Sequence, residues 1–254
     1  MTNHPKIVLI TGAAVRIGKW IAESMASDGW SVALHCNTNY KAAENLAEKI
    51  RGQGGIAEVF RANLACEDDV EKLIPQVVQS MAPISCLINN ASTFEYDSSE
   101  SATRSSWDLH MEVNLRAPFV LSQNFSKISN RTTQGIIINI LDQRVWNITP
   151  HYITYTLSKS GLWVLTQSLA LDLAPHIRVN AIGPGPVLPN QRQTNYDFNK
   201  QWENTPLKRQ ISSEEITNTV KYILNTPSLT GQMLAIDSGQ HLGWSMPATS
   251  ELVE

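Results

Sequence analysis

The feature that most constrains the fold is an alternation of short apolar runs with amphipathic helical stretches. The runs predicted to be strands are Ile7–Ile10, Ser31–His35, Ala57–Arg61, Cys86–Asn89, Gly135–Leu141, Arg178–Ile182 and Met233–Ile236. Between them apolar residues recur at helical spacing, as in the stretch Val70–Met81. This βαβ order predicts a parallel sheet with right-handed crossovers and helices on both faces. The expected fold class is therefore α/β, with a doubly wound, seven-stranded sheet.

Neither an internal repeat nor a low-complexity linker divides the 254 residues, so we expect one domain over residues 1–254. A hydrophobic share of 42% argues against disorder, and a net charge of -3 offers no basic excess for nucleic acid. Residues 183 to about 199 are rich in Pro, Asn and Gln and follow a predicted strand. Since ligands bind at the carboxyl ends of such strands, this segment is predicted to be a substrate lid; a mobile surface loop is the alternative.

Cysteine usage and hydropathy exclude several classes of protein. Cys36, Cys66 and Cys86 are far apart and form no Cys/His cluster, so neither a disulfide framework nor a metal site is expected. No stretch approaches the roughly 18 apolar residues of a membrane span, and the N-terminus lacks a small-residue cleavage site. We expect a cytoplasmic protein without a membrane partner.

Two turns contain small residues at the ends of predicted strands. The first, TGAAVRIG at positions 11–18, opens the first helix, where backbone N–H groups and the helix dipole favour a pyrophosphate; a tight turn without a ligand is the alternative. The second, NNAS at positions 89–92, allows close backbone approach, although it too is compatible with a simple turn. The dinucleotide contacts expected here are Thr11, Gly12, Arg16, Ile17, Gly18, Asn90, Ala91 and Ser92.

Tyr155 and Lys159 lie four residues apart in a predicted helix, Thr154–Ala174. This spacing places both side chains on one helix face, where the ammonium can lower the pKa of the phenol and make it a usable acid. A tyrosine packed beneath a snorkelling lysine is the structural alternative.

Taken in order, these segments, Asn114 and the Gly-Pro-Gly at 183–185 resemble the short-chain dehydrogenase/reductase family over the whole chain. The resemblance implies a Rossmann domain and NAD(P)(H)-dependent hydride transfer. It makes Tyr155 the proton donor, Lys159 a ligand of the nicotinamide ribose, and Asn114 the support of a proton-relay water. It also implies cofactor contacts at Asn63, Leu64, Pro184 and Gly185.

Relatives in this family are commonly tetramers, so a homotetramer is expected. The apolar C-terminal region around Leu234, Ile236, Leu242 and Trp244 is one candidate interface, and it is equally compatible with core packing.

Two departures from the family pattern narrow the resemblance. Arg16 replaces the middle glycine of the usual turn, and Asp142 replaces the serine expected thirteen residues before Tyr155. Together with Phe94, which ends the stretch NNASTF, this pattern resembles the pteridine reductases and the related bacterial dihydromonapterin and dihydrofolate reductases. An ionised Asp142 would repel the negative charge that grows on a ketone oxygen, whereas the nitrogen of a C=N bond must gain a proton.

Cofactor choice depends on the end of the second predicted strand. No acidic residue between Leu34 and Asn39 is present to bind a ribose 2′-OH, which favours NADPH/NADP+ held by Asn37, Thr38 and Asn39 with help from Arg16.

The predicted function is reduction of a C=N bond in a dihydropterin-like small molecule. Phe94 would stack on the substrate ring, while Arg16, Asp142 and Tyr155 would contact its polar groups. A carbonyl reductase of a small keto substrate and a non-catalytic NADP(H)-binding regulator are the alternatives.

Overall fold

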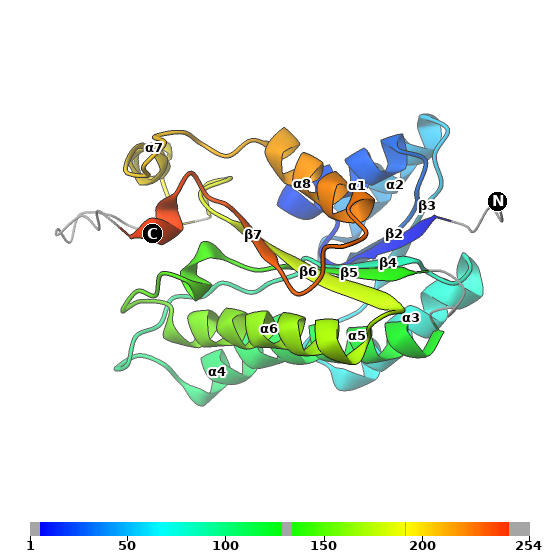
Figure 1. Ribbon diagram of the computed structural model, residues 1–254, viewed down its shortest axis with the longest axis horizontal. Helices are drawn as coiled ribbons and strands as arrows, with labels where there is room; N and C mark the ends of the chain where they lie inside the picture. The colour runs from blue at the N-terminus through cyan, green and yellow to red at the C-terminus, as the bar shows by residue number, and fades with distance from the viewer. Residues whose placement is uncertain (1–5, 129–133, 191, 244–254) are drawn as a thin grey trace.

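The chain forms a seven-stranded parallel sheet between two layers of helices (Figure 1). The structure is a computed structural model that describes residues 6–128, 134–190 and 192–243. The strands lie in the order β3-β2-β1-β4-β5-β6-β7. Their bounds are β1 Ile7–Ile10, β2 Ser31–Cys36, β3 Ala57–Arg61, β4 Cys86–Asn89, β5 Gly135–Ile140, β6 Ile177–Pro184 and β7 Met233–Ile236. The predicted fold class, a doubly wound Rossmann-type sheet, is confirmed.

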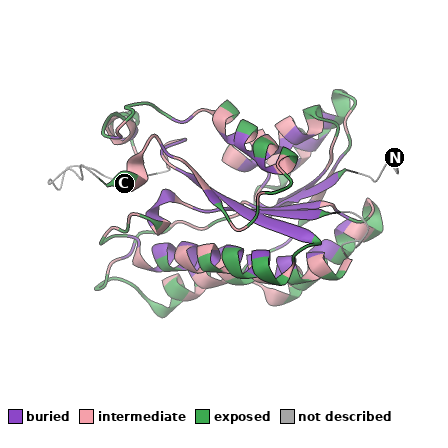
Figure 2. Cartoon of the chain, in the orientation of Figure 1, coloured by how far each residue is buried: buried purple, intermediate pink, exposed green. Residues whose placement is uncertain are grey.

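The helices divide between the two faces of the sheet. One face carries α1 (Arg16–Ser27), α2 (Tyr40–Gly52) and α8 (Ser213–Asn225). The other carries α3 (Glu67–Ser80), α4 (Arg104–Met111), α5 (Ala117–Ile128) and α6 (Ile153–Asp172). Alternate residues of a strand enter opposite cores: Val8 and Ile10 join the α1/α8 cluster, whereas Ile7 and Leu9 join the α3/α5 cluster. Both faces of the sheet are therefore buried, as Figure 2 shows.

The order of the strands creates a crevice at the carboxyl edge of the sheet. β1 pairs with β2 on one side and with β4 on the other, so the connections that follow β1 and β4 leave in opposite directions. Ligands of doubly wound sheets bind at this switch point. The two turns singled out from the sequence, 11–18 and 89–92, both begin here.

Segment 183–199 is more regular than the sequence indicated. Gly183 and Pro184 are still part of β6, paired with Ala235 and Ile236 of β7. At the other end, α7 (Asn195–Glu203) begins after a capping box formed by Thr194 and Asp197. The connection between the two elements is thus confined to residues 185–194, of which residue 191 lies outside the described part.

The candidate oligomer interface is mostly internal. Leu234 and Ile236 are partly buried against the α1/α8 cluster, while Leu242 is exposed. Trp244 lies outside the described residues, and the tetramer stays a prediction. No helix among the described residues is both long and apolar enough to cross a bilayer.

Candidate active site

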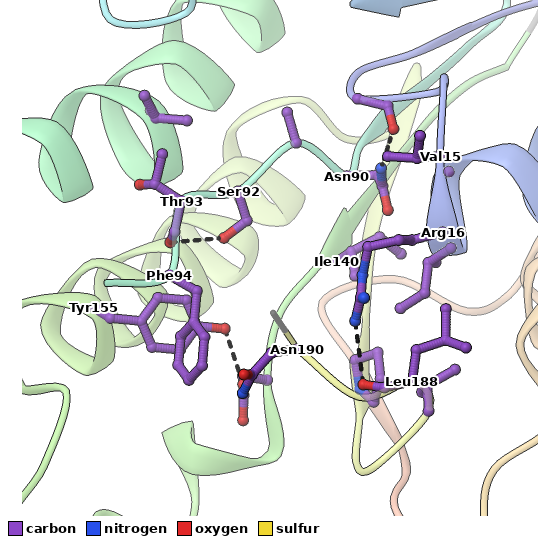
Figure 3. A pocket seen from close by; sticks show the side chains of 18 of the residues that line it. Val15, Arg16, Asn90, Ser92, Thr93, Phe94, Ile140, Tyr155, Leu188 and Asn190 are labelled. Atoms are coloured by element: carbon purple, nitrogen blue, oxygen red, sulfur yellow. Dashed lines mark hydrogen bonds between the residues drawn. The ribbon is translucent and has the colours of Figure 1, made fainter. Parts of the chain in front are cut away.

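A cleft of about 550 Å³ opens at the switch point of the sheet (Figure 3). It collects residues from the ends of β1 to β6 and from the connection after β6. Most of the predicted site residues line it: Gly12, Arg16, Ile17, Gly18, Asn37, Thr38, Asn39, Asn63, Leu64, Asn90, Ala91, Ser92, Phe94, Asp142, Tyr155, Lys159, Pro184 and Gly185. Thr11 and Asn114 are not among the lining residues, and both are buried behind the wall of the cleft.

The glycine turn brings backbone to the surface of the cleft. A Cβ on Gly18 would lie 2.3 Å from the carbonyl oxygen of Gly12, so only glycine fits there. Gly12 has a φ of +63°, and a Cβ on it would lie 3.0 Å from Cα of Ala91. Because Val15 makes no side-chain cap on α1, the first N–H groups of that helix are left for another acceptor. This cradle fits a pyrophosphate.

Arg16 occupies a backbone position that favours glycine. Its φ is +54°, in the left-handed region, which explains why the usual family pattern has glycine there. The guanidinium donates hydrogen bonds to the carbonyl oxygens of Pro189 at 2.8 Å and Leu188 at 3.2 Å (Figure 3). Arg16 thus ties the glycine turn to the connection after β6. Its expected contacts with a phosphate and with a substrate ring stay predictions.

Thr11 joins the turn after β1 to the turn after β4. Its Oγ1 accepts hydrogen bonds from the backbone N–H of Asn90 at 2.9 Å and of Ala91 at 3.0 Å. In return, Nδ2 of Asn90 donates to the carbonyl oxygens of Thr11 at 2.8 Å and Gly12 at 3.1 Å. Thr11 therefore holds the two turns together from beneath the cleft.

His35 supports the same turn, although no motif in the sequence indicates this role. Its Nδ1 accepts from the backbone N–H of Gly12 at 3.1 Å, so its Nε2 carries the proton and donates to the carbonyl oxygen of Ala62, also at 3.1 Å. Burial lowers the pKa of His35 to about 4, which keeps the ring neutral. The ring connects the glycine turn to the end of β3.

The guanidinium of Arg61, on the neighbouring strand β3, lies beside the end of β2. Nε of Arg61 donates to the carbonyl oxygen of Asn37 at 3.1 Å, and Nδ2 of Asn37 lies 3.4 Å from Oδ1 of Asn63. Arg61 is the register partner of Cys36, so the sheet places its side chain beside the segment predicted to bind a ribose 2′-substituent. Arg61 lies well beyond that segment in the chain, so the sequence pattern does not indicate its contact with the end of β2.

Tyr155, Asp142 and Lys159 meet at the inner end of the cleft. The Tyr155 hydroxyl donates to Oδ2 of Asp142 at 2.9 Å, and Oδ1 of Asp142 accepts from the backbone N–H of Arg144 at 2.9 Å. Nζ of Lys159 donates to the carbonyl oxygen of Ile140 at 2.8 Å.

The pKa of Tyr155 differs from the sequence-based expectation. Burial and the Asp142 carboxylate raise it well above its usual value, although Lys159 was expected to lower it. Burial also lowers the pKa of Lys159 to about 8, against the raising effect of Asp142. The carboxylate, and not the ammonium, therefore has the larger effect on the phenol, and Tyr155 stays protonated.

Asn114 connects the wall of the cleft to α6. It lies in a short π-helix, Glu112–Arg116, between α4 and α5. Its Oδ1 accepts from the backbone N–H of Thr93 at 2.8 Å, and its Nδ2 donates to Oγ of Ser158 at 3.1 Å. The structure gives Asn114 this bracing contact, and its expected support of a relay water stays a prediction.

The chain matches the family model for short chain dehydrogenase over residues 6–200. It belongs to the short-chain dehydrogenase family. A crystal structure of FolM alternative dihydrofolate reductase 1 from Brucella canis, complexed with NADP, is 44% identical, with a TM-score of 0.92 and coverage of 96% of this chain and 97% of that one.

Two curated relatives of this short-chain dehydrogenase are more distant. The uncharacterized oxidoreductase YmfI of Bacillus subtilis is 30% identical over 244 residues, which are 93% of this chain and 99% of the relative. The 3-oxoacyl-[acyl-carrier-protein] reductase FabG of Staphylococcus epidermidis is 29% identical over 242 residues, with the same two coverages. The chain is an oxidoreductase of this family.

In this short-chain dehydrogenase, Phe94 belongs to a larger aromatic group. It stacks on Tyr152 with a centroid distance of 4.3 Å and an interplanar angle of 10°, and it meets the Tyr155 ring edge-on at 4.6 Å. Arg192 lies over Phe94 at 5.5 Å and donates to its carbonyl oxygen at 2.7 Å while pairing with Glu95 at 2.9 Å. We name Phe94 and Tyr152 the aromatic pair. The sequence pattern gave no signal for Tyr152, which reaches Phe94 only through a left-handed backbone, with a φ of +57°.

Proposed function

We propose that this oxidoreductase uses NADPH to reduce a C=N bond in a dihydropterin-like substrate. The observation that carries the proposal is the hydrogen bond of 2.9 Å from the Tyr155 hydroxyl to Asp142. In the family pattern this position is a serine, which can donate to a carbonyl oxygen. A carboxylate repels a developing oxyanion and favours a reacting atom that collects a proton.

The cleft suits NADP(H) on three grounds. The glycine cradle fits a pyrophosphate, the end of β2 has no acidic side chain, and Arg61 places a cation beside Asn37. The Brucella canis relative was crystallised with NADP, in keeping with this assignment. We assign the phosphates to the turn at 11–18, the adenosine half to residues 37–39 and 63–64, and the nicotinamide half to Asn90, Tyr155, Lys159 and Gly185. When bound, NADPH supplies the hydride.

Tyr155 delivers the proton. Its raised pKa keeps the hydroxyl protonated at neutral pH, and its position against Asp142 fixes where that proton lies. As the substrate nitrogen gains electron density, the hydroxyl, positioned until then by Asp142, turns its proton to that nitrogen and becomes a phenolate. Lys159, anchored on Ile140, limits the negative charge left on Tyr155.

The aromatic pair supports the substrate class. A flat, fused heteroaromatic ring binds best against an aromatic surface, and Phe94 lies beside the proton donor. The connection after β6 is the lid in this proposal, and its described residues are held beside the cleft by Arg16, which donates to Pro189, and by the Arg192–Glu95 ion pair.

The test measures NADPH oxidation at 340 nm with dihydrobiopterin, dihydromonapterin, dihydrofolate and a panel of small ketones. We expect turnover with at least one dihydropterin and little with the ketones. Ketone reduction without pterin reduction would favour the chemistry named in the FabG relative and would overturn the proposal. Tight NADPH binding without any turnover would instead indicate a regulator.

A further inference from the structure

A group of buried, hydrogen-bonded polar side chains lies behind the aromatic pair, and the proposed function assigns no role to it. We name it the buried polar network. It consists of Asp97, in the connection between β4 and α4, His110 on α4 and Thr154 at the start of α6. The exposed fractions are 1% for Asp97, 0% for His110 and 1% for Thr154, and none of the three lines the cleft. The buried polar network therefore touches neither substrate nor cofactor directly.

Each hydrogen bond in the buried polar network can run in only one direction. The backbone N–H of Glu95 donates to Nε2 of His110 at 3.1 Å, so Nε2 accepts and the proton lies on Nδ1. Nδ1 then donates to Oγ1 of Thr154 at 2.7 Å, and Thr154 donates its own hydroxyl proton to Asp97. Because a backbone donor stands at one end and a carboxylate at the other, no member can reverse.

Burying polar groups costs free energy that their hydrogen bonds must offset, and a satisfied buried network makes the segments that it joins rigid. No ion pair with Asp97 occurs in the described parts of the chain, and burial lowers the pKa of His110 against the effects of Asp97 and Glu95. Asp97 also accepts from the backbone N–H of Thr154 at 3.1 Å. Since Tyr152 makes no side-chain cap on α6, Asp97 caps this helix from another segment.

This buried polar network is joined to the reacting groups at two places. Glu95 directly follows Phe94, and Thr154 directly precedes Tyr155. The His110 ring also meets the Tyr155 ring edge-on at 6.0 Å. We propose that Asp97, His110 and Thr154 are positioning residues that hold Phe94 and Tyr155 in one relative geometry, so that a ring stacked at Phe94 meets the Tyr155 hydroxyl. This inference rests on the proposed function.

The test compares Thr154→Val with Thr154→Ser. Valine keeps the shape of the side chain and removes the hydroxyl that links His110 to Asp97, whereas serine keeps the hydroxyl. We expect Thr154→Val to raise the KM of the dihydropterin at least about fivefold and to lower kcat at least about tenfold. The Kd of NADPH should change by less than about twofold, because the buried polar network lies away from the glycine turn. Thr154→Ser should restore both kinetic constants.

Thr166→Val is the matched control for lost stability. Thr166 lies on the same helix, is fully buried, accepts from Asn139 at 2.9 Å and donates to Leu162 at 2.8 Å, and neither of these hydrogen bonds involves Phe94 or Tyr155. This variant should lower Tm much as Thr154→Val does, with kcat and KM nearly unchanged. Equal kinetic losses in both variants, or equal losses in Thr154→Val and Thr154→Ser, would overturn the proposal.

Circular dichroism shows whether Thr154→Val folds. If it does not fold, His110→Gln tests the same proposal. Glutamine can still accept from Glu95 but breaks the link to Thr154, so the same changes in KM and kcat are expected, and wild-type kinetics would refute the assignment. All variants are compared on whichever substrate the wild type reduces. Absence of pterin reduction in the wild type therefore overturns the proposed function, while the comparison among variants still decides the positioning role.

Discussion

Replacing Asp142 tests the reaction class most directly. The Tyr155 hydroxyl donates to its carboxylate at 2.9 Å, and a hydrogen bond to a charged group contributes about 1.5–3 kcal/mol. If that energy is realised in the transition state, Asp142→Ser should lower kcat/KM for a dihydropterin about 10- to 150-fold. Ketone reduction should stay level or rise, because serine restores a neutral donor.

Asp142→Asn separates charge from shape. Asparagine keeps the volume but offers one acceptor oxygen to two donors, the Tyr155 hydroxyl and the backbone N–H of Arg144. Serine and asparagine both cap helix N-termini well, so neither variant should disturb the short helix that Asp142 caps, Gln143–Val145. A similar loss of pterin reduction in both variants would assign the effect to the charge.

The pH profile supplies an independent readout. Asp142 raises the pKa of Tyr155 and also that of Lys159, so its removal lowers both. Since the protonated phenol is the proposed proton donor, the basic limb of kcat/KM should move to lower pH in both variants. Steady-state rates from about pH 6 to pH 10 measure this shift. Unchanged pterin kcat/KM together with an unchanged basic limb in Asp142→Ser would refute the reasoning.

Three further predictions concern the cofactor, the acid and the glycine turn. Arg61→Gln should raise the Kd of NADPH about tenfold or more and leave that of NADH within about twofold, as measured by fluorescence titration; an equal loss for both would limit Arg61 to holding Asn37. Tyr155→Phe should lower turnover about 10²- to 10⁴-fold with NADPH binding retained, and near-full activity would rule out this donor. Because the pKa of His35 is about 4 when folded, the unfolded chain binds more protons between pH 6.5 and 4, so stability falls as pH falls. In urea unfolding, wild type should lose about 2 kcal/mol between pH 7 and pH 5 that His35→Gln does not lose, and parallel losses would contradict this.

The sheet was predictable from sequence because its strands are buried on both faces. Such strands are short apolar runs, and the predicted bounds of β1, β3, β4 and β7 match the structure. β6 extends two residues further than predicted, to Pro184, because glycine and proline indicate a turn although both here continue the pairing with β7. Local composition cannot reveal a pairing that a distant strand provides.

The cleft was predictable for a related reason. Parallel strands place their carboxyl ends at one edge, so turns such as 11–18 and 89–92 meet whatever the details of packing. Interactions that depend on packing across the fold were not predictable. Arg61 reaches Asn37 through strand register, and Tyr152 stacks on Phe94 through one left-handed residue. Neither arrangement leaves a periodic signal.

The pKa of Tyr155 shows why residue spacing alone was insufficient at the chemical centre. The Tyr155–Lys159 spacing places an ammonium near a phenol, and Nζ lies 5.8 Å from the ring centroid. Asp142 is closer, however, since it accepts the phenol's own hydrogen bond, and burial strengthens that effect while weakening the charge of Lys159 itself. With serine at this position, the lysine would face no competing carboxylate, and the phenol would ionise more readily. The carboxylate thus suits the proposed reaction, in which the phenol keeps its proton until a basic nitrogen takes it, better than one in which an oxyanion develops.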